Sequence, residues 1–170
     1  MTSTFKHLRA IILLPGVVTI IVPGLLIAVT RTIQTGWSLI EPLNWILIGT
    51  GVVLIAFGLV LVIKTISLLA KIGQGTLAPW DPTHKLVVQG IYRFVRNPMI
   101  SGVFCIVLGE TLILGSMLMM YELIIFAVLN LFYIPLIEEP GLVDRFGDEY
   151  RQYKQHVPRW IPHSKPWIPN

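Results

Sequence analysis

The stretch Pro79–Gly102, PWDPTHKLVVQGIYRFVRNPMISG, is the longest polar interruption in a chain that otherwise reads as apolar. It contains a histidine, a Gly-x-Tyr sequence, two arginines and the dipeptide Asn97-Pro98, and it runs directly into another apolar segment. Membrane proteins gather their functional groups in such loops and at polar positions within the spans. The sequence therefore predicts an integral membrane protein whose functional residues lie in and beside this stretch.

The composition agrees with a membrane protein. Of the 170 residues, 54% are hydrophobic and 13% are charged, whereas a soluble domain carries roughly 25% charged residues. This length predicts a single domain, 1–170, and the lone Cys105 predicts no disulfide. The formal net charge of +4 is too small to indicate nucleic-acid binding. We therefore expect the lipid bilayer, and no nucleic acid, as a partner.

Four apolar segments predict an all-α bundle of about four transmembrane helices, because about 20 apolar residues cross a bilayer. Gly49, Gly51 and Gly58 are small enough to let another helix approach closely, and Gly115-Ser116 marks the turn of a helical hairpin. The sequence leaves open whether a fifth or re-entrant helix exists. The predicted spans cover residues 10–30, 43–70, 98–114 and 118–137.

The segment after the last span is predicted to be an amphipathic helix over residues 142–157. Its apolar residues recur at helical spacing, and charged residues occupy the other faces. We expect a break in the chain before it, at the Glu-Glu-Pro-Gly of residues 138–141. The final residues, rich in proline and tryptophan, cannot form a regular helix.

The distribution of lysine and arginine predicts the orientation of the bundle. With four spans, nearly all of these residues fall on one side, and Arg31 lies alone on the other. Cytoplasmic loops carry such an excess of positive charge. We therefore expect a multi-pass protein, in a membrane of the prokaryotic inner-membrane type. Both termini, the loop at residues 72–97 and the amphipathic tail are expected to lie in the cytoplasm.

Two adjacent carboxylates, Glu138 and Glu139, follow the last span. Carboxylates at the carboxyl end of a helix oppose the helix dipole, so they need a partner. That partner is either an arginine such as Arg93 or Arg96, or a cationic ligand. Spacing alone favours the interfacial salt bridge over the ligand site.

The dipeptide Asn97-Pro98 predicts the start of a helix, because asparagine is a favoured N-cap and proline a favoured first residue. The backbone N–H groups there serve either a simple capped helix or the carboxylate of a ligand. Glu110 is an ionisable residue within a span, where it either lines a polar cavity or bonds to a neighbouring helix. No second histidine or cysteine lies at metal-ligand spacing from His84, so we expect no metal.

Two motifs together resemble a known family. HKLVVQGIYRFVRNPMISG, starting at His84, and EEPGLVDRFGDEYRQYKQHVPRWIP, starting at Glu138, resemble the integral membrane methyltransferases of the isoprenylcysteine carboxyl methyltransferase and phospholipid N-methyltransferase group. The resemblance extends from Gly75 onward and implies a cytoplasmic pocket for S-adenosyl-L-methionine. Carried over by position, the implied cofactor-binding residues are His84, Lys85, Leu86, Val87, Tyr92, Arg96, Asn97, Pro98, Met99, Ile100, Gly102, Glu138 and Glu139.

The resemblance also implies methyl transfer to a lipophilic or amphipathic acceptor: a lipid amine, a prenylcysteine-like carboxylate or a small thiol. Glu139, Glu110 or a tyrosine would receive a proton from an amine. The chain departs from the family pattern at Asn97, where a histidine is frequent, and at Ile134, where the prenylcysteine enzymes carry an arginine. The second departure argues against prenylcysteine esterification.

Two other functions remain compatible with the sequence. Sterol reductases are similar around a Gly-x-Tyr and Arg-x-Pro loop and use NADPH, but the acidic pair favours the methyltransferase. A helical membrane scaffold without enzymatic activity, in which the loop merely covers the bundle, is the non-enzymatic alternative. The oligomeric state does not follow from the sequence.

Overall fold

The computed structural model describes residues 12–30, 36–73 and 83–169. Over these residues the regular structure is entirely helical, which confirms the all-α prediction. The elements, in chain order, are η1 (Ile12–Ile21), α2 (Val22–Thr30), α3 (Glu41–Leu68), η2 (Leu69–Gly73), η3 (Gly90–Arg93), α4 (Pro98–Leu114), α5 (Met117–Tyr133), η4 (Ile134–Glu138) and α6 (Glu139–His156).

Two continuous helical segments are long and apolar enough to cross a membrane, Glu41–Gly73 and Met117–His156. Two shorter apolar helices, Pro15–Val29 and Pro98–Leu114, accompany them. Most side chains of the two long segments are not covered by protein, as a lipid-facing helix requires. The predicted loop at 72–97 is described only in part, and Lys6, Arg9 and Arg31, on which the orientation partly depends, lie outside the described residues.

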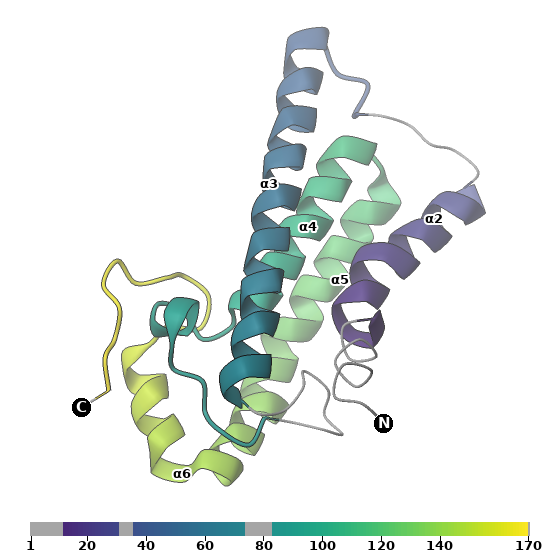
Figure 1. Ribbon diagram of the computed structural model, residues 1–170. Helices are drawn as coiled ribbons and strands as arrows, with labels where there is room; N and C mark the ends of the chain where they lie inside the picture. Colours follow the sequence, from purple (N-terminus) through teal and green to yellow (C-terminus); the bar gives the residue numbers. More distant parts are fainter. Residues whose placement is uncertain (1–11, 31–35, 74–82, 170) are drawn as a thin grey trace.

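Glycines bring α3 and α4 into close contact. A Cβ atom on Gly58 would lie 2.5 Å from the carbonyl oxygen of Gly102, and one on Gly51 would lie 2.7 Å from that of Gly109. Two glycines seven residues apart on each helix therefore face each other in antiparallel order (Figure 1). The predicted role is confirmed for Gly51 and Gly58, but it is wrong for Gly49, which has nothing within 4 Å of a Cβ position.

A helical hairpin joins α4 to α5 at the predicted turn. Gly115 ends α4 in the left-handed conformation (φ 60°), and its N–H donates to the carbonyl of Thr111. The hydroxyl of Thr111 is fully buried and lies 2.7 Å from the carbonyl oxygen of Val107 and 3.3 Å from that of Met119 across the turn. The turn of the hairpin is thus held by the N–H of Gly115 and by the hydroxyl of Thr111, one helical turn earlier.

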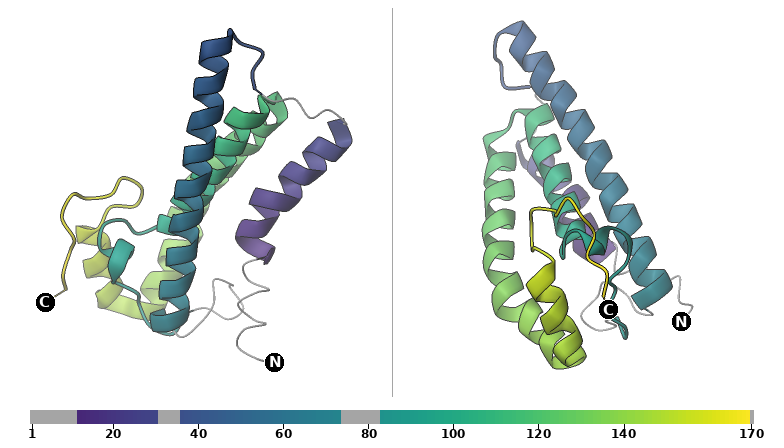
Figure 2. Two further views of the ribbon diagram at one scale, coloured as in Figure 1. Left: turned by 45° about the horizontal axis from the view of Figure 1, so that its top comes forward. Right: turned by 90° about the vertical axis from the view of Figure 1, so that its left-hand side faces the viewer.

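The expected break at residues 138–141 is wrong. A π-helical turn, η4, leads from α5 into α6 without leaving the helical conformation at Glu138 or Glu139. Pro135 and Pro140 lie inside this continuous helical run, and a local π-helical turn is one of the adjustments by which a membrane helix accommodates proline. The chain instead changes direction at Gly147 (φ 55°, ψ −129°), and α6 then runs back alongside the bundle (Figure 2).

The amphipathic helix is confirmed, and it packs on the polar loop. Tyr150, Tyr153 and Val157 are buried against apolar residues of the segment 86–88. The non-helical tail that follows is bonded to the loop through its main chain, as expected for a segment that cannot be a helix. These bonds run from the N–H of Arg96 to the carbonyl of Pro158 (2.9 Å), from His163 to Phe94 (3.0 Å) and from Trp167 to Arg93 (3.0 Å).

Candidate functional site

A cavity of about 660 Å³ lies where the polar loop, the start of α4, the end of α5 and the start of α6 meet. Its volume is in the range of small-molecule and cofactor sites. Both motifs that carried the family resemblance reach its wall. The predicted cofactor-binding residues that line it are Leu86, Val87, Tyr92, Arg96, Asn97, Met99, Ile100 and Glu138.

Glu139 lies beside the cavity, at the centre of a buried cluster of charges. Its Oε1 atom accepts hydrogen bonds from Nη1 of Arg96 (2.8 Å) and Nε of Arg159 (2.7 Å), and its Oε2 atom lies 2.8 Å from Nζ of Lys154. The arginine partner expected for the acidic pair is therefore present for Glu139. Its side chain is 2% exposed and that of Arg96 is 8% exposed, so this pair lies in a medium where charges interact strongly.

The two adjacent carboxylates are in opposite electrostatic environments. Burial by itself raises the pKa of Glu139, but the contacts with Arg159 and Lys154 and the charge of Arg96 outweigh burial and hold this pKa at about 2. Burial raises the pKa of Glu138, the charge of Glu139 raises it further, and Arg145 opposes both. Glu139 is thus permanently ionised and neutralised, whereas Glu138 is the acid that faces the cavity.

The opposite edge of the cavity offers hydrogen-bond donors that the protein leaves unused. The Nε atom of Arg96 is buried and has no hydrogen-bond partner in the described part of the chain. Asn97 occupies the N-cap position of α4, as predicted, but its side chain makes no capping bond. The first N–H groups of α4 and the guanidinium edge of Arg96 therefore form a site for an anionic group.

The carbonyl group of Tyr92 is held by a hydrogen bond, and its hydroxyl group is buried. The hydroxyl of Tyr153 donates to the carbonyl oxygen of Tyr92 over 2.7 Å. Burial raises the pKa of Tyr92, and the charge of Glu138 raises it further. The phenol therefore stays neutral and presents an aromatic face and a polar group to the cavity.

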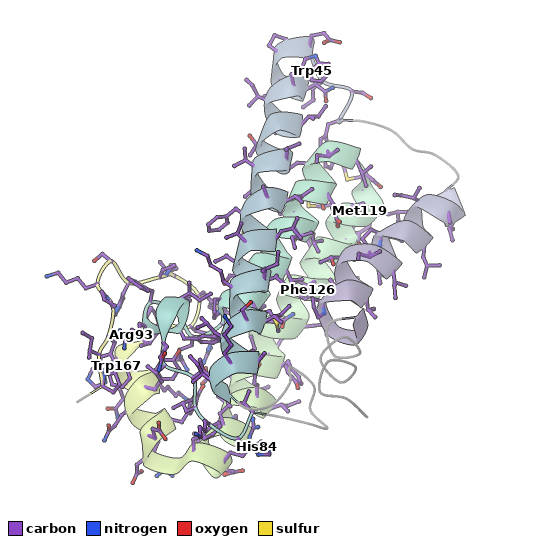
Figure 3. The ribbon with its side chains drawn as sticks, viewed as in Figure 1. Trp45, His84, Arg93, Met119, Phe126 and Trp167 are labelled. Carbon is purple, nitrogen blue, oxygen red and sulfur yellow. The ribbon has the colours of Figure 1, made fainter. Side chains whose placement is uncertain are left out.

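Besides Glu139, five other predicted site residues do not line this cavity. His84 and Lys85 are exposed, and their backbone N–H groups bond to the carbonyl of Gly73 (Figure 3). Pro98 is fully buried in the first turn of α4. Gly102 faces Gly58 of α3, so its role is in helix packing.

Glu110, the fifth of these, is more than three helical turns beyond Pro98, about 18 Å along α4. It interacts with Glu122 across the hairpin, and both residues have buried oxygen atoms without a hydrogen-bond partner among the described residues. At this distance it cannot receive a proton from a group bound near Glu138. The catalytic role predicted for Glu110 stays a prediction, and its position away from the cavity wall does not favour it.

Several residues of the site were not singled out from the sequence. Arg159 and Lys154 hold Glu139, and Tyr150 lies 3.3 Å from Nη1 of Arg96. No local sequence pattern predicts these contacts. The α5 face of the cavity was missed as well, although a lone asparagine, Asn130, in an apolar run was a visible signal.

Known proteins resemble parts of this chain. Protein-S-isoprenylcysteine O-methyltransferase of Schizosaccharomyces pombe is 42% identical over 81 residues, covering 46% of this chain and 34% of that protein. Methanethiol S-methyltransferase 1 of Bradyrhizobium diazoefficiens is 37% identical over 75 residues, covering 42% and 24%. Protein-S-isoprenylcysteine O-methyltransferase of Mus musculus is 27% identical over 139 residues, covering 76% and 46%. The matches thus span less than half the length of these three relatives.

A family description covers more than half of the chain. The phospholipid methyltransferase family matches residues 46–149, from the first turns of α3 to the middle of α6. This region contains the whole polar loop, the glycine-mediated contact of α3 with α4, and the acidic pair. The chain belongs to the phospholipid methyltransferase family.

Proposed function

We propose that this protein is an S-adenosyl-L-methionine-dependent methyltransferase that acts on a membrane-dissolved or amphipathic methyl acceptor. One observation carries the proposal. A single cavity joins donors unused among the described residues, at Arg96 and the start of α4, to the carboxylate of Glu138, which has no ion-pair partner in the same part of the chain. The relatives named above support the reaction class, since each is named as a methyltransferase.

The residues present fit the charges of this cofactor. Its carboxylate would be held by Nε of Arg96 and the N–H groups that open α4. Its ammonium would be held by Glu138. The apolar residues Leu86, Val87 and Met99 would cover its uncharged parts, and the neutral ring of Tyr92 suits a nearby cation.

The bound cofactor would supply an electrophilic methyl group, so the protein need not activate it further. The chain's own residues would align the acceptor and exclude water. Glu139 would not act as a base, because its pKa of about 2 and its ion pairs leave it without affinity for a proton. Its role would be to hold Arg96 at the cavity wall, which makes it a positioning residue.

We also propose that the four apolar helical segments all cross the membrane, with the loop and the tail on the cytoplasmic side. The two long segments, the two shorter ones and the charge distribution of the sequence support this topology. The cofactor would then enter the cavity from the cytoplasm. The methyl acceptor would reach it from the bilayer.

Calorimetric titration of the detergent-solubilised protein with S-adenosylhomocysteine tests the proposal. The wild type should bind, and Glu138→Gln should weaken binding at least tenfold, because a charge-assisted hydrogen bond is lost. Glu122→Gln, in the distant hairpin, is the matched control and should bind normally. Binding of NADPH in place of S-adenosylhomocysteine would indicate a reductase, and binding of neither would indicate a scaffold.

A further inference from the structure

The cavity continues along one face of α5, away from its charged end. This part of the wall is formed by Phe126, Asn130, Tyr133 and Ile137. Their spacing of four, three and four residues places them on one side of the helix. Figure 3 shows Phe126 on α5 near the lower turns of the first drawn helix, which are η1, and η1 also contributes to the wall. The cavity therefore reaches from the acidic pair into the apolar bundle.

Asn130 is the carboxamide on this apolar wall. Its Nδ2 atom donates to the carbonyl oxygen of Phe126, one turn earlier, over 2.8 Å. This bond fixes the orientation of the amide, since only the NH₂ group can donate to a carbonyl. The Oδ1 atom has no hydrogen-bond partner in the part of the chain that the structure describes. An unused hydrogen-bond acceptor thus lies on an otherwise apolar wall.

A purely structural role does not account for Asn130. The carbonyl of Phe126 already accepts the helical N–H bond, so the side-chain bond adds little to the helix. A polar group among apolar side chains costs free energy unless it meets a partner. Because Asn130 lines the cavity, a molecule in the cavity can supply the missing partner.

The position of Asn130 suits the methyl acceptor and not the cofactor. It precedes Glu138 by eight residues, about 12 Å along the helix axis. A molecule that joins Arg96 to Glu138 occupies the charged end of the cavity. The space beside Asn130 remains for a second molecule that arrives from the apolar side.

The charges of the wall restrict the head group of this second molecule. No lysine or arginine occurs on α5 or η4 between Phe126 and Ile137. The side chain of Ile134 is 1% exposed and does not line the cavity. Two arginines of the wall, Arg96 and Arg145, lie at the charged end, beside Glu139 and Glu138. A carboxylate beside Asn130 would have no cation, whereas a group with an N–H or S–H would find Oδ1.

We propose that Asn130 positions the methyl acceptor by accepting a hydrogen bond from its nucleophilic head group, and that this head group is bound with a hydrogen-bond donor and no negative charge. When the new bond to the methyl carbon forms and the carbon–sulfur bond of the cofactor breaks, the head group would release its proton to solvent at the cytoplasmic mouth of the cavity. The inference rests on the proposed function, which it deepens by restricting the acceptor class. It assigns Asn130 as a specificity-determining residue on α5, eight residues before the acidic pair.

The test uses three probes of equal chain length: decylamine, decanethiol and decanoate. Transfer of labelled methyl groups from S-adenosyl-L-methionine to each probe is measured with the protein in vesicles. The wild type should methylate the amine or the thiol and leave decanoate unmodified. Methylation of decanoate in preference to both other probes, or of none of the three by protein that binds S-adenosylhomocysteine, would overturn the proposal.

Two variants separate positioning from structure. Asn130→Leu, of similar size, should raise KM for the methylated probe or lower kcat/KM about tenfold or more. Its affinity for S-adenosylhomocysteine should stay within about twofold of the wild type. Asn130→Asp retains a hydrogen-bond acceptor and should restore transfer to decylamine. Leu129→Ala, an exposed residue outside the cavity wall, is the control.

The outcomes also distinguish this inference from the proposed function. A wild type that does not bind S-adenosylhomocysteine refutes the proposed function itself. Normal S-adenosylhomocysteine binding with unchanged transfer kinetics in Asn130→Leu refutes only the role of Asn130. An equal loss of S-adenosylhomocysteine affinity and transfer in Asn130→Leu would place Asn130 in the cofactor site or the fold, which also overturns the inference.

Discussion

Nη1 of Arg96 lies 2.8 Å from Oε1 of Glu139, and less than a tenth of either side chain is exposed. Forty-three residues separate them along the chain. The pair connects the loop before α4 to the start of α6, and the same guanidinium lines the cavity. Stability and the proposed ligand binding therefore depend on the same buried ion pair.

Replacing Glu139 should destabilise the protein strongly. Glu139→Gln leaves Arg96 buried without a counter-charge, and breaking a buried pair in this way costs about 3–5 kcal/mol. Unfolding in a denaturant series measures the loss. Asp148→Asn is the matched control, because Asp148 pairs with Arg151 in solvent, where such pairs contribute about 0–1 kcal/mol. Equal effects of the two substitutions would contradict the buried pair.

Acid should remove the contribution of Glu139. Its folded-state pKa of about 2 lies below its ordinary value of 4.5, so the unfolded chain binds the proton more readily. The stabilisation is present above pH 4.5 and is lost as the pH falls towards 2. The difference in unfolding midpoint between wild type and Glu139→Gln should narrow over that range. A difference that stays constant with pH would contradict the lowered pKa.

Ligand binding should respond to pH through Glu138. Burial raises the pKa of this carboxyl above its ordinary value, and a protonated acid no longer attracts an ammonium group. Affinity for S-adenosylhomocysteine should therefore fall as the pH is lowered, beginning above pH 4.5. In Glu138→Gln the affinity should be low and, over the same range, nearly independent of pH. Calorimetry at several pH values compares the two proteins.

Adding a methyl group between α3 and α4 should separate the helices. Gly58→Ala places a Cβ 2.5 Å from the carbonyl oxygen of Gly102, and overpacking of this kind costs about 1–3 kcal/mol. Gly49→Ala meets nothing within 4 Å and should be neutral or slightly stabilising. Thermal midpoints of the two variants test the contact, and a greater loss in Gly49→Ala would contradict it.

Local signals in the sequence predicted local structure well. Asn97-Pro98 predicted the start of α4, and Gly115 predicted its end. Both predictions succeeded because helix capping and the left-handed conformation depend on adjacent residues. The break at residues 138–141 was misplaced for a related reason. A π-helical turn carries the helix past Pro135 and Pro140, and the direction changes at Gly147 instead.

Contacts between distant segments could not be predicted. Glu139 meets Arg159 and Arg96 across 20 and 43 residues, and no periodicity encodes such a meeting. The sequence singled out both acidic residues but could not tell which one was neutralised. Glu110 was predicted to be catalytic because an acidic residue within a span indicates function wherever it lies. Only the structure shows its distance from the cavity.

The main-chain bonds from the tail to the loop have a consequence for biogenesis. During translation the ribosome completes Arg96 long before Pro158 and Trp167, which bond to the segment 93–96. Until then the backbone groups of this segment that bond to the tail have no partner. Arg96 likewise has no counter-charge until Glu139 has been synthesised. The helices can insert first. The cavity between them is complete only when the last of these partners has left the ribosome.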